Sequence, residues 1–160
     1  MIGRRGFTLI EVLVVMTIIG ILLRIATINF NKFQTKSGIT GEISALRNEL
    51  MAARAAAMFQ HRDRRVALGS TGFAVYSSLV DTVAPVQRKS LKYPISYSSS
   101  TIDFDSQGFY SAATGASASL CVEPSGNIAA VDSLVIMTAR IHAGKRVTGG
   151  GCTSASINVE

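Results

Sequence analysis

Residues that could carry acid–base or nucleophilic chemistry are few in this chain and widely spaced. Its two histidines, His61 and His142, lie far apart in the sequence, and each is expected to be a solvated surface residue. Asp103 and Asp105 alternate around Phe104. Their carboxyl groups would share one face of a strand and could act as an acid–base pair, but a solvated face beside a turn is the favoured interpretation. Since no phosphate-loop, His-Glu-x-x-His or Cys-x-x-Cys motif is present, the sequence predicts a protein that is not an enzyme and holds no cofactor or metal.

The only two thiols belong to Cys121 and Cys152. If this part of the chain lies in an oxidising compartment, the two are expected to form a disulfide bond. Closing a loop of about thirty residues would stabilise the fold by roughly 3–4 kcal/mol. The alternative is two separate buried thiols.

Basic residues gather in two short segments, residues 61–65 and 140–146. In the second segment, Arg140 and His142 stand at alternate positions and would lie on one side of a strand, beside a turn formed by Gly144, Lys145 and Arg146. Such clusters are more often solvated faces than binding sites. A net charge of +6 makes anionic partners worth considering, but no aromatic residues are interleaved for stacking on bases.

Glu11 is the most unusual charged residue, because it lies inside an apolar run. A carboxylate in the core of a membrane helix costs on the order of 2.5–3.5 kcal/mol, so it should have a partner. The run follows a basic head with Arg4 and Arg5, as in a secretory signal, but no small-x-small cleavage site follows it. Cleavage between Gly6 and Phe7 would instead create an α-amino group one helical turn from Glu11.

The element that must position Glu11 is a long helix. From residue 7 to residue 23 it would extend for about 25 Å, and to residue 30 for about 35 Å, enough to cross a hydrocarbon core of ~30 Å. Arg24 would have to extend its side chain toward a headgroup layer. Arg4 and Arg5 would stay on the cytoplasmic side, with the rest of the chain outside. A plain N-terminal membrane anchor is the simplest alternative.

Residues 31–62 continue the helix with an amphipathic pattern. Polar side chains fall largely between apolar ones that recur every three or four residues. The helix is expected to end near His61. The recurring apolar residues, expected to pack on a sheet, are Ile39, Ile43, Leu46, Leu50, Ala53 and Ala57.

After residue 62 the sequence turns to short strand-like runs separated by Gly, Ser, Asp and Pro. The segments 69–72 and 124–126 resemble turns. A helix followed only by strands predicts an α+β fold, with an antiparallel sheet or small sandwich packed on the second half of the helix. The expected strands are 65–68, 73–77, 95–97, 101–104, 108–110, 119–122, 127–130, 133–140 and 156–159.

Composition agrees with this division. The chain has 160 residues, of which 48% are hydrophobic and 16% charged. That balance excludes a disordered chain, and two cysteines are too few for a disulfide-based scaffold. Much of the apolar excess belongs to the first helix.

The segment Gly6-Phe-Thr-Leu-Ile-Glu11, with the apolar run after it, resembles the leader of type IV prepilins and pseudopilins. The resemblance covers about the first thirty residues. It implies cleavage after Gly6 and N-methylation of Phe7 by a prepilin peptidase and methyltransferase, with Glu11 neutralising the N-terminal amine of an adjacent subunit. Arg24 and Ile28 replace a small residue and a proline that are common in the family, which favours a low-copy subunit.

This resemblance defines four parts of the chain: a leader at 1–6, a transmembrane and assembly helix at 7–30, an amphipathic helix at 31–62 and a β-rich head at 63–160. It implies a single-pass protein of the bacterial inner membrane, with a cytoplasmic N-terminus and a periplasmic head, that later enters a filament. The implied partners are membrane lipid, other pilin or pseudopilin subunits and the inner-membrane assembly platform.

The segment 102–108 is similar to H-type minor pseudopilins of the general secretion pathway and to related minor pilins. A structural subunit of a type II secretion or type IV pilus filament is therefore expected. Some pilus relatives bind DNA through a basic C-terminal segment. The alternative is accordingly a DNA-binding minor pilin for natural transformation, with Arg140, Lys145 and Arg146 as the candidate contacts.

Overall fold

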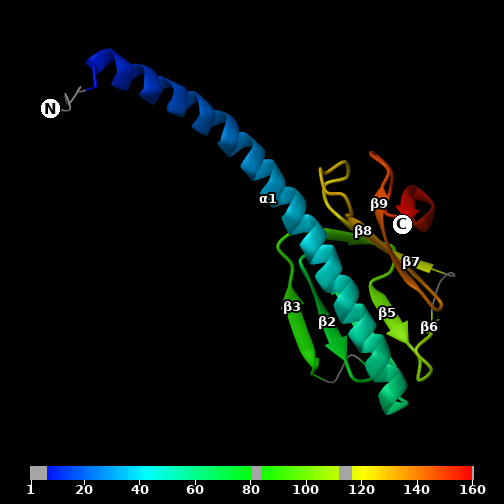
Figure 1. Ribbon diagram of the computed structural model, residues 1–160. Coiled ribbons are helices and arrows are strands. Elements are labelled where there is room, and N and C mark those ends of the chain that lie inside the picture. Colours follow the sequence, from blue (N-terminus) through cyan, green and yellow to red (C-terminus); the bar gives the residue numbers. More distant parts are fainter. Residues whose placement is uncertain (1–6, 81–83, 112–116, 160) are drawn as a thin grey trace. The chain divides into compact units, whose positions relative to one another are not determined.

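The computed structural model describes residues 7–80, 84–111 and 117–159. The chain divides into two compact units, Met1–Thr35 and Lys36–Glu160. Its one long helix, α1, runs from Leu9 to Gln60 and contributes to both units. Figure 1 shows this helix and the strands that follow it.

From residue 12 to residue 23, the exposed surface of α1 consists almost wholly of apolar side chains. By length and composition alone it could cross a membrane, and no residue in its most apolar stretch is buried. Its threonine hydroxyl groups turn back onto the helix: Thr17 donates to the Val14 carbonyl at 2.7 Å, and Thr27 to the Leu23 carbonyl at 3.1 Å. Polar hydrogens satisfied within the helix are suited to apolar surroundings.

In the second unit, one face of α1 forms the centre of the core. The six apolar positions expected from the sequence are all buried, which confirms the predicted amphipathic pattern. Their spacing of three and four residues places them in one stripe along the helix. They are Ile39, Ile43, Leu46, Leu50, Ala53 and Ala57.

The strands form two five-stranded antiparallel sheets. The first sheet has the order β3-β2-β1-β5-β6 and the second has the order β10-β9-β8-β7-β4. The first contains β1 (Arg64–Gly69), β2 (Gly72–Tyr76), β3 (Gln87–Ser90), β5 (Thr101–Phe104) and β6 (Tyr110–Ser111). The second contains β4 (Ile95–Tyr97), β7 (Ser117–Val122), β8 (Ser133–Met137), β9 (Ile141–Arg146) and β10 (Ile157–Val159), the last preceded by a short 3-10 helix at Ser154–Ser156.

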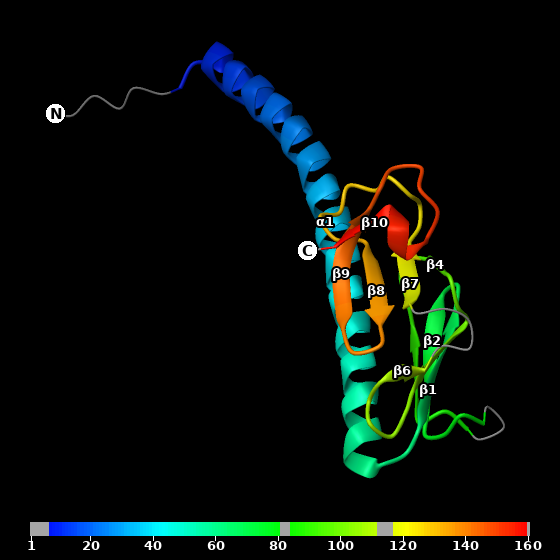
Figure 2. The ribbon, with the colours of Figure 1, turned by 90° about the vertical axis from the view of Figure 1, so that its right-hand side faces the viewer.

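A single apolar core joins α1 to both sheets. Val66 and Phe104 of the first sheet and Leu120 and Ile136 of the second belong to one buried cluster with the helix stripe. Figure 2 shows α1 beside both sets of strands from a second direction. The predicted α+β fold, a long helix on antiparallel sheets, is confirmed.

The chain after β3 is fastened to α1. The Glu42 carboxylate accepts hydrogen bonds from the backbone N–H groups of Lys92 and Tyr93. A side chain at Gly38 would place its Cβ 2.8 Å from the Tyr93 hydroxyl oxygen. The absence of a side chain at Gly38 therefore leaves room for the Tyr93 ring. This packing explains why a glycine is present inside the helix, where it costs roughly 1 kcal/mol relative to alanine.

The structure corrects several predicted strands. The predicted turn at 69–72 is present, with Gly69 opposite Gly72. Residues 127–130 are not a strand, because the Asn127 side chain bonds to its own loop. The predicted strand 133–140 ends at Met137. β3 was not predicted, because its sequence Gln-Arg-Lys-Ser has no apolar alternation.

Candidate functional site

The residues predicted to be processed, Gly6 and Phe7, come shortly before α1 in the sequence. Gly6 lies outside the described residues, and Phe7 is the first residue that the structure describes. The Phe7 side chain is exposed, and the helix begins two residues later, at Leu9. The bond that would be cleaved thus adjoins the start of the helix.

Thr8 caps this helix, a role that was not predicted from the sequence. Its hydroxyl oxygen accepts a hydrogen bond from the Glu11 backbone N–H at 3.3 Å, and its carbonyl accepts one from the same group at 3.1 Å. Thr-x-x-Glu is the sequence pattern of a capping box, so the signal was available. Glu11 therefore has a local role: its negative charge lies in the first turn, where the helix dipole favours an acid.

The Glu11 carboxylate itself is exposed, and none of the residues in the described ranges donates a hydrogen bond to it. Among residues 7–31, only Glu11 and Arg24 are charged. The surface around them consists of exposed leucine, isoleucine, valine and methionine side chains. An apolar surface of this extent is suited to lipid or to the apolar surface of another helix.

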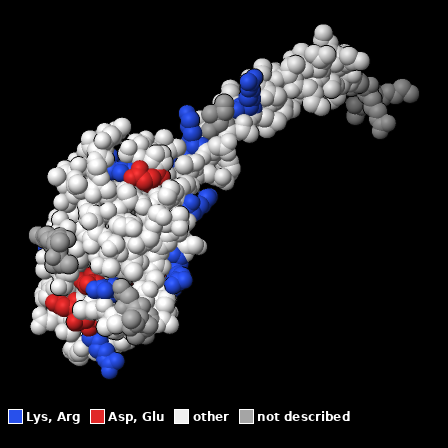
Figure 3. Space-filling view, turned by 180° about the vertical axis from the view of Figure 1, so that it is seen from behind, with Lys and Arg blue, Asp and Glu red and all other residues white. Residues whose placement is uncertain are grey.

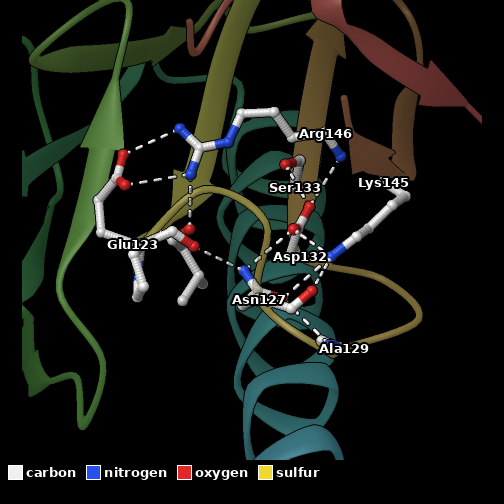
Figure 4. Close-up of polar contacts among 9 residues, drawn as sticks. Glu123, Asn127, Ala129, Asp132, Ser133, Lys145 and Arg146 are labelled. Atoms are coloured by element: carbon white, nitrogen blue, oxygen red, sulfur yellow. Dashed lines mark hydrogen bonds and ion pairs between the residues drawn. The ribbon is translucent and has the colours of Figure 1, made fainter. Parts of the chain in front are cut away.

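The basic residues predicted to form a site near the C-terminus are engaged in contacts within the head. Lys145 and Arg146 lie in β9, not in a turn. The Lys145 ammonium donates to the Asp132 carboxylate at 2.7 Å and to two oxygens of Asn127, at 2.7 and 3.0 Å. All three of its hydrogens are thereby engaged (Figure 4).

Arg146 is only 3% exposed. Its guanidinium binds both carboxylate oxygens of Glu123, at 2.9 and 3.1 Å, and the Val122 carbonyl at 2.9 Å. This bidentate pair holds the pKa of Glu123 below its ordinary value, and the bond from Ser96 lowers it further, although burial opposes the shift.

Asp132 is the buried centre of this cluster, with no exposed surface. Burial alone would raise its pKa. Hydrogen bonds from the Arg146 backbone N–H, the Lys145 ammonium and the Ser133 hydroxyl, together with the Lys145 charge, outweigh burial and hold the pKa below its ordinary value. The cluster thus fixes the 123–132 loop onto β9, and we call it the Asp132 network.

The candidate DNA contacts therefore do not form a basic surface. Arg140 is exposed, whereas Lys145 is engaged by the Asp132 network and Arg146 is buried. On the face drawn in Figure 3, Lys and Arg side chains are dispersed, some beside Asp or Glu, and form no continuous patch. A phosphate backbone needs free cationic groups, and two of the three candidates do not offer them.

The remaining candidates for chemistry have structural roles. Asp103 binds the Arg65 guanidinium through both oxygens, each at 2.8 Å. Asp105 accepts hydrogen bonds from the backbone N–H groups of Gln107 and Phe109, at 2.9 and 2.8 Å, and so organises the turn before β6. In the described part of the chain, no group of three His, Cys, Asp or Glu side chains could hold a metal ion.

Cys121 and Cys152 form a disulfide bond, with their Cα atoms 5.8 Å apart. Cys121 is fully buried in β7, where it packs with Val135 and Ile157 in a second small core. The bond attaches the segment after β9 to β7 of the second sheet. The alternative of two separate thiols does not apply.

Comparison with known proteins adds two findings. Residues 1–26 match the prokaryotic N-terminal methylation motif. The fold is similar to that of the type IV minor pilin FimU of Pseudomonas aeruginosa. In one crystal form the sequences are 16% identical, with 69% of this chain and 91% of that chain covered and a TM-score of 0.56. In a second form the identity is 17%, the coverage 65% and 90%, and the TM-score 0.52.

No curated protein sequence matches the chain significantly. The chain thus combines a methylation motif at its N-terminal end with a head whose fold is similar to that of a type IV minor pilin.

Proposed function

We propose that this chain is a minor pilin or pseudopilin, a structural subunit of a type IV pilus or type II secretion filament. The observation that carries the proposal is the methylation motif at residues 1–26, placed on a helix with an exposed apolar surface. A pilin-like head follows in the same chain. The ion pairs Arg65–Asp103, Lys145–Asp132 and Arg146–Glu123 hold elements of the head together, which supports a structural role rather than an enzymatic one.

Maturation follows from the motif. A prepilin peptidase hydrolyses the Gly6–Phe7 bond, and the new amino group of Phe7 is methylated. The resulting ammonium lies at the positive end of the α1 dipole, where a cation is unfavourable. A carboxylate nearby offsets this cost, and Glu11 of the same or an adjacent subunit supplies it.

Assembly then relies on the apolar surface of the helix. Before assembly this surface is covered by lipid of the inner membrane, with the leader cytoplasmic and the head periplasmic. An oxidising periplasm agrees with the Cys121–Cys152 bond. In the filament, the helices of other subunits replace lipid, after the chain has met the inner-membrane assembly platform.

Two resemblances bear on the choice between a pilus and a secretion filament. The resemblance of segment 102–108 to H-type minor pseudopilins supports the secretion filament, and the fold of FimU supports the pilus. DNA binding is not favoured, because Lys145 and Arg146 have internal partners.

The first prediction concerns processing. In cells with an active prepilin peptidase, the chain should begin at Phe7 and carry one added methyl group, as measured by N-terminal sequencing and intact mass of membrane-extracted protein. Gly6→Leu should leave the N-terminus at Met1, because the peptidase must fit the residue before the cleaved bond. Gly3→Leu, a matched change within the leader, should be processed normally. An unprocessed wild-type chain would contradict the proposal.

A further inference from the structure

β3 is an open edge of the first sheet. It is the last strand in the order β3-β2-β1-β5-β6, and all four of its residues are exposed. Among the strands in the described part of the chain, none pairs with its outer side, and Figure 1 shows it as the outermost strand. The other strands at sheet edges are shorter, with three residues in β4 and β10 and two in β6.

The register of β3 shows which backbone groups face outward. β3 pairs antiparallel with β2, with Gln87 opposite Val75 and Lys89 opposite Phe73. The next residue in this alternation, Leu91, donates its N–H to the Thr71 carbonyl at 2.8 Å. Hydrogen-bonded and non-bonded pairs alternate in an antiparallel ladder. Gln87 and Lys89 therefore bond inward to β2.

By the same alternation, the N–H and C=O groups of Arg88 and Ser90 point away from the sheet. These two residues can donate and accept hydrogen bonds to another extended chain without disturbing β2. The structure thus presents a row of backbone groups of the kind that strand addition uses.

Charge makes this edge selective. Arg88, Lys89 and Lys92 lie within five residues of sequence, and all three are at least partly exposed. The nearest acids on α1 are already engaged: Glu49 pairs with Lys89 at 3.5 Å and also accepts from Gln87 at 3.2 Å, and Glu42 accepts the two backbone bonds after β3. Cations on an edge oppose pairing with a second copy of the same edge, but they favour an acidic strand.

A groove adjoins the edge on the face of the sheet turned away from the core. It has a volume of about 410 Å³, and small residues such as Ala67, Gly72 and Ala74 line it together with Arg88 and Ser90. Side chains of an added strand that fall on this face would have room beside Arg88. The neighbouring surface thus admits an added strand.

We propose that β3 binds an extended, acidic segment of a neighbouring filament subunit by strand addition. Backbone hydrogen bonds to Arg88 and Ser90 hold the segment, and the Arg88 and Lys92 charges select acidic side chains. The inference rests on the proposed filament role, and it identifies the surface that selects a neighbour.

Incorporation of the full-length chain into filaments tests this surface, measured as its amount in filaments sheared from cells relative to the amount in membranes. Ser90→Pro removes the outward backbone N–H of residue 90 but leaves the hydrogen bonds between β3 and β2 in place. Ser90→Ala keeps this N–H as well as the hydrogen bonds to β2. We expect Ser90→Pro to reduce incorporation by about tenfold, as a lost hydrogen bond and a steric clash would do, and Ser90→Ala to leave it unchanged. Processing at Gly6 should be normal in both.

Charge is tested separately. Arg88→Glu should reduce incorporation by about tenfold through repulsion of an acidic segment, and Arg88→Lys should preserve it. Arg62→Glu, at an exposed position outside the edge, is the matched control and should have no effect. Thermal unfolding midpoints identify any variant that fails to fold. If the Ser90→Pro and Arg88→Glu variants both enter filaments in the same amount as the wild-type chain, the inference is overturned. If the wild-type chain itself is absent from filaments, the proposed function is overturned instead.

Discussion

At the scale of single residues, Asp132 shows how the head tolerates a buried charge. A carboxylate with no exposed surface is normally unfavourable. Here it accepts hydrogen bonds from Asn127, Ser133 and Lys145 and from the Arg146 backbone. Asn127 in turn binds the Ala129 N–H and the Pro124 carbonyl, so the loop depends on one buried acid.

Asp132→Asn should lower the free energy of unfolding at pH 7 by about 3 kcal/mol, because it leaves Lys145 without its charged partner and places an amide where donors already converge. Asp63→Asn is the matched control: Asp63 is exposed and accepts one hydrogen bond, from the Ser106 N–H, so a loss of about 1 kcal/mol is expected. Denaturant unfolding of full-length protein in detergent, followed by tyrosine fluorescence, measures both.

The same network predicts the direction of the pH dependence. The folded-state pKa values of Asp132 and Glu123 are lower than their ordinary values near 4. Their contribution to stability is therefore fully present above about pH 5 and is lost as the pH falls through the folded pKa values. Asp132→Asn should flatten this acid-side loss. An unchanged pH profile would contradict the assigned role of Asp132.

At the scale of elements, α1 ends in a motif that uses an unfavourable residue. The His61 N–H donates to the Met58 carbonyl at 3.4 Å, and the Arg62 N–H to the Ala57 carbonyl at 3.2 Å. These two bonds are those of a Schellman motif. His61 occupies its left-handed position, with φ of 49°, where glycine is usual because a Cβ is unfavourable there.

His61→Gly should therefore stabilise the head by about 1 kcal/mol, since it relieves the left-handed backbone of a residue with a side chain. Ala52→Gly, at an exposed position inside the helix, should do the opposite and cost about 1 kcal/mol. Both are measured by denaturant unfolding. Destabilisation by His61→Gly would show that the histidine side chain contributes more than its backbone strain costs.

Elements also show which features the sequence could predict. The six buried positions of α1 follow from local periodicity, because the distance between apolar residues along a helix is fixed by its geometry. β3 could not be predicted, because its side chains are polar on both faces of the sheet. Its pairing with β2 depends on the course of the segment that connects the two strands. The Thr8 cap could have been predicted, because Thr-x-x-Glu is the sequence pattern of a capping box.

The candidate site divides in the same way. Phe7 and Glu11 belong to a contiguous motif, so their proposed roles could be predicted from residue types alone. Lys145 and Arg146 were misread as a free basic turn, because their partners Asp132 and Glu123 lie 13 and 23 residues away in sequence. Only the pairing of β8 with β9 and the course of the intervening loop bring those groups together.

At the scale of the whole molecule, the disulfide ties the end of the chain to the second sheet. It joins residues 31 apart. Replacing Cys121 and Cys152 by alanine should lower the free energy of unfolding by about 3–4 kcal/mol in the chain-entropy description. A reducing agent should cause a similar loss of unfolding free energy in the wild-type protein and no further loss in the double variant. A loss below about 1 kcal/mol would mean that the surrounding contacts hold the segment without the bond.

The fastening of α1 to the head has a mechanical consequence. A pull applied along residues 9–35 reaches the second unit through the backbone of one helix, and the helix is attached to more than one element there. Glu42 binds the chain after β3, Glu49 binds β3 itself, and Arg54 donates to the Ala139 carbonyl, between β8 and β9, at 2.6 Å. Within the second unit, a load that reaches the helix is thus shared between both sheets, and no single one of these contacts bears it alone.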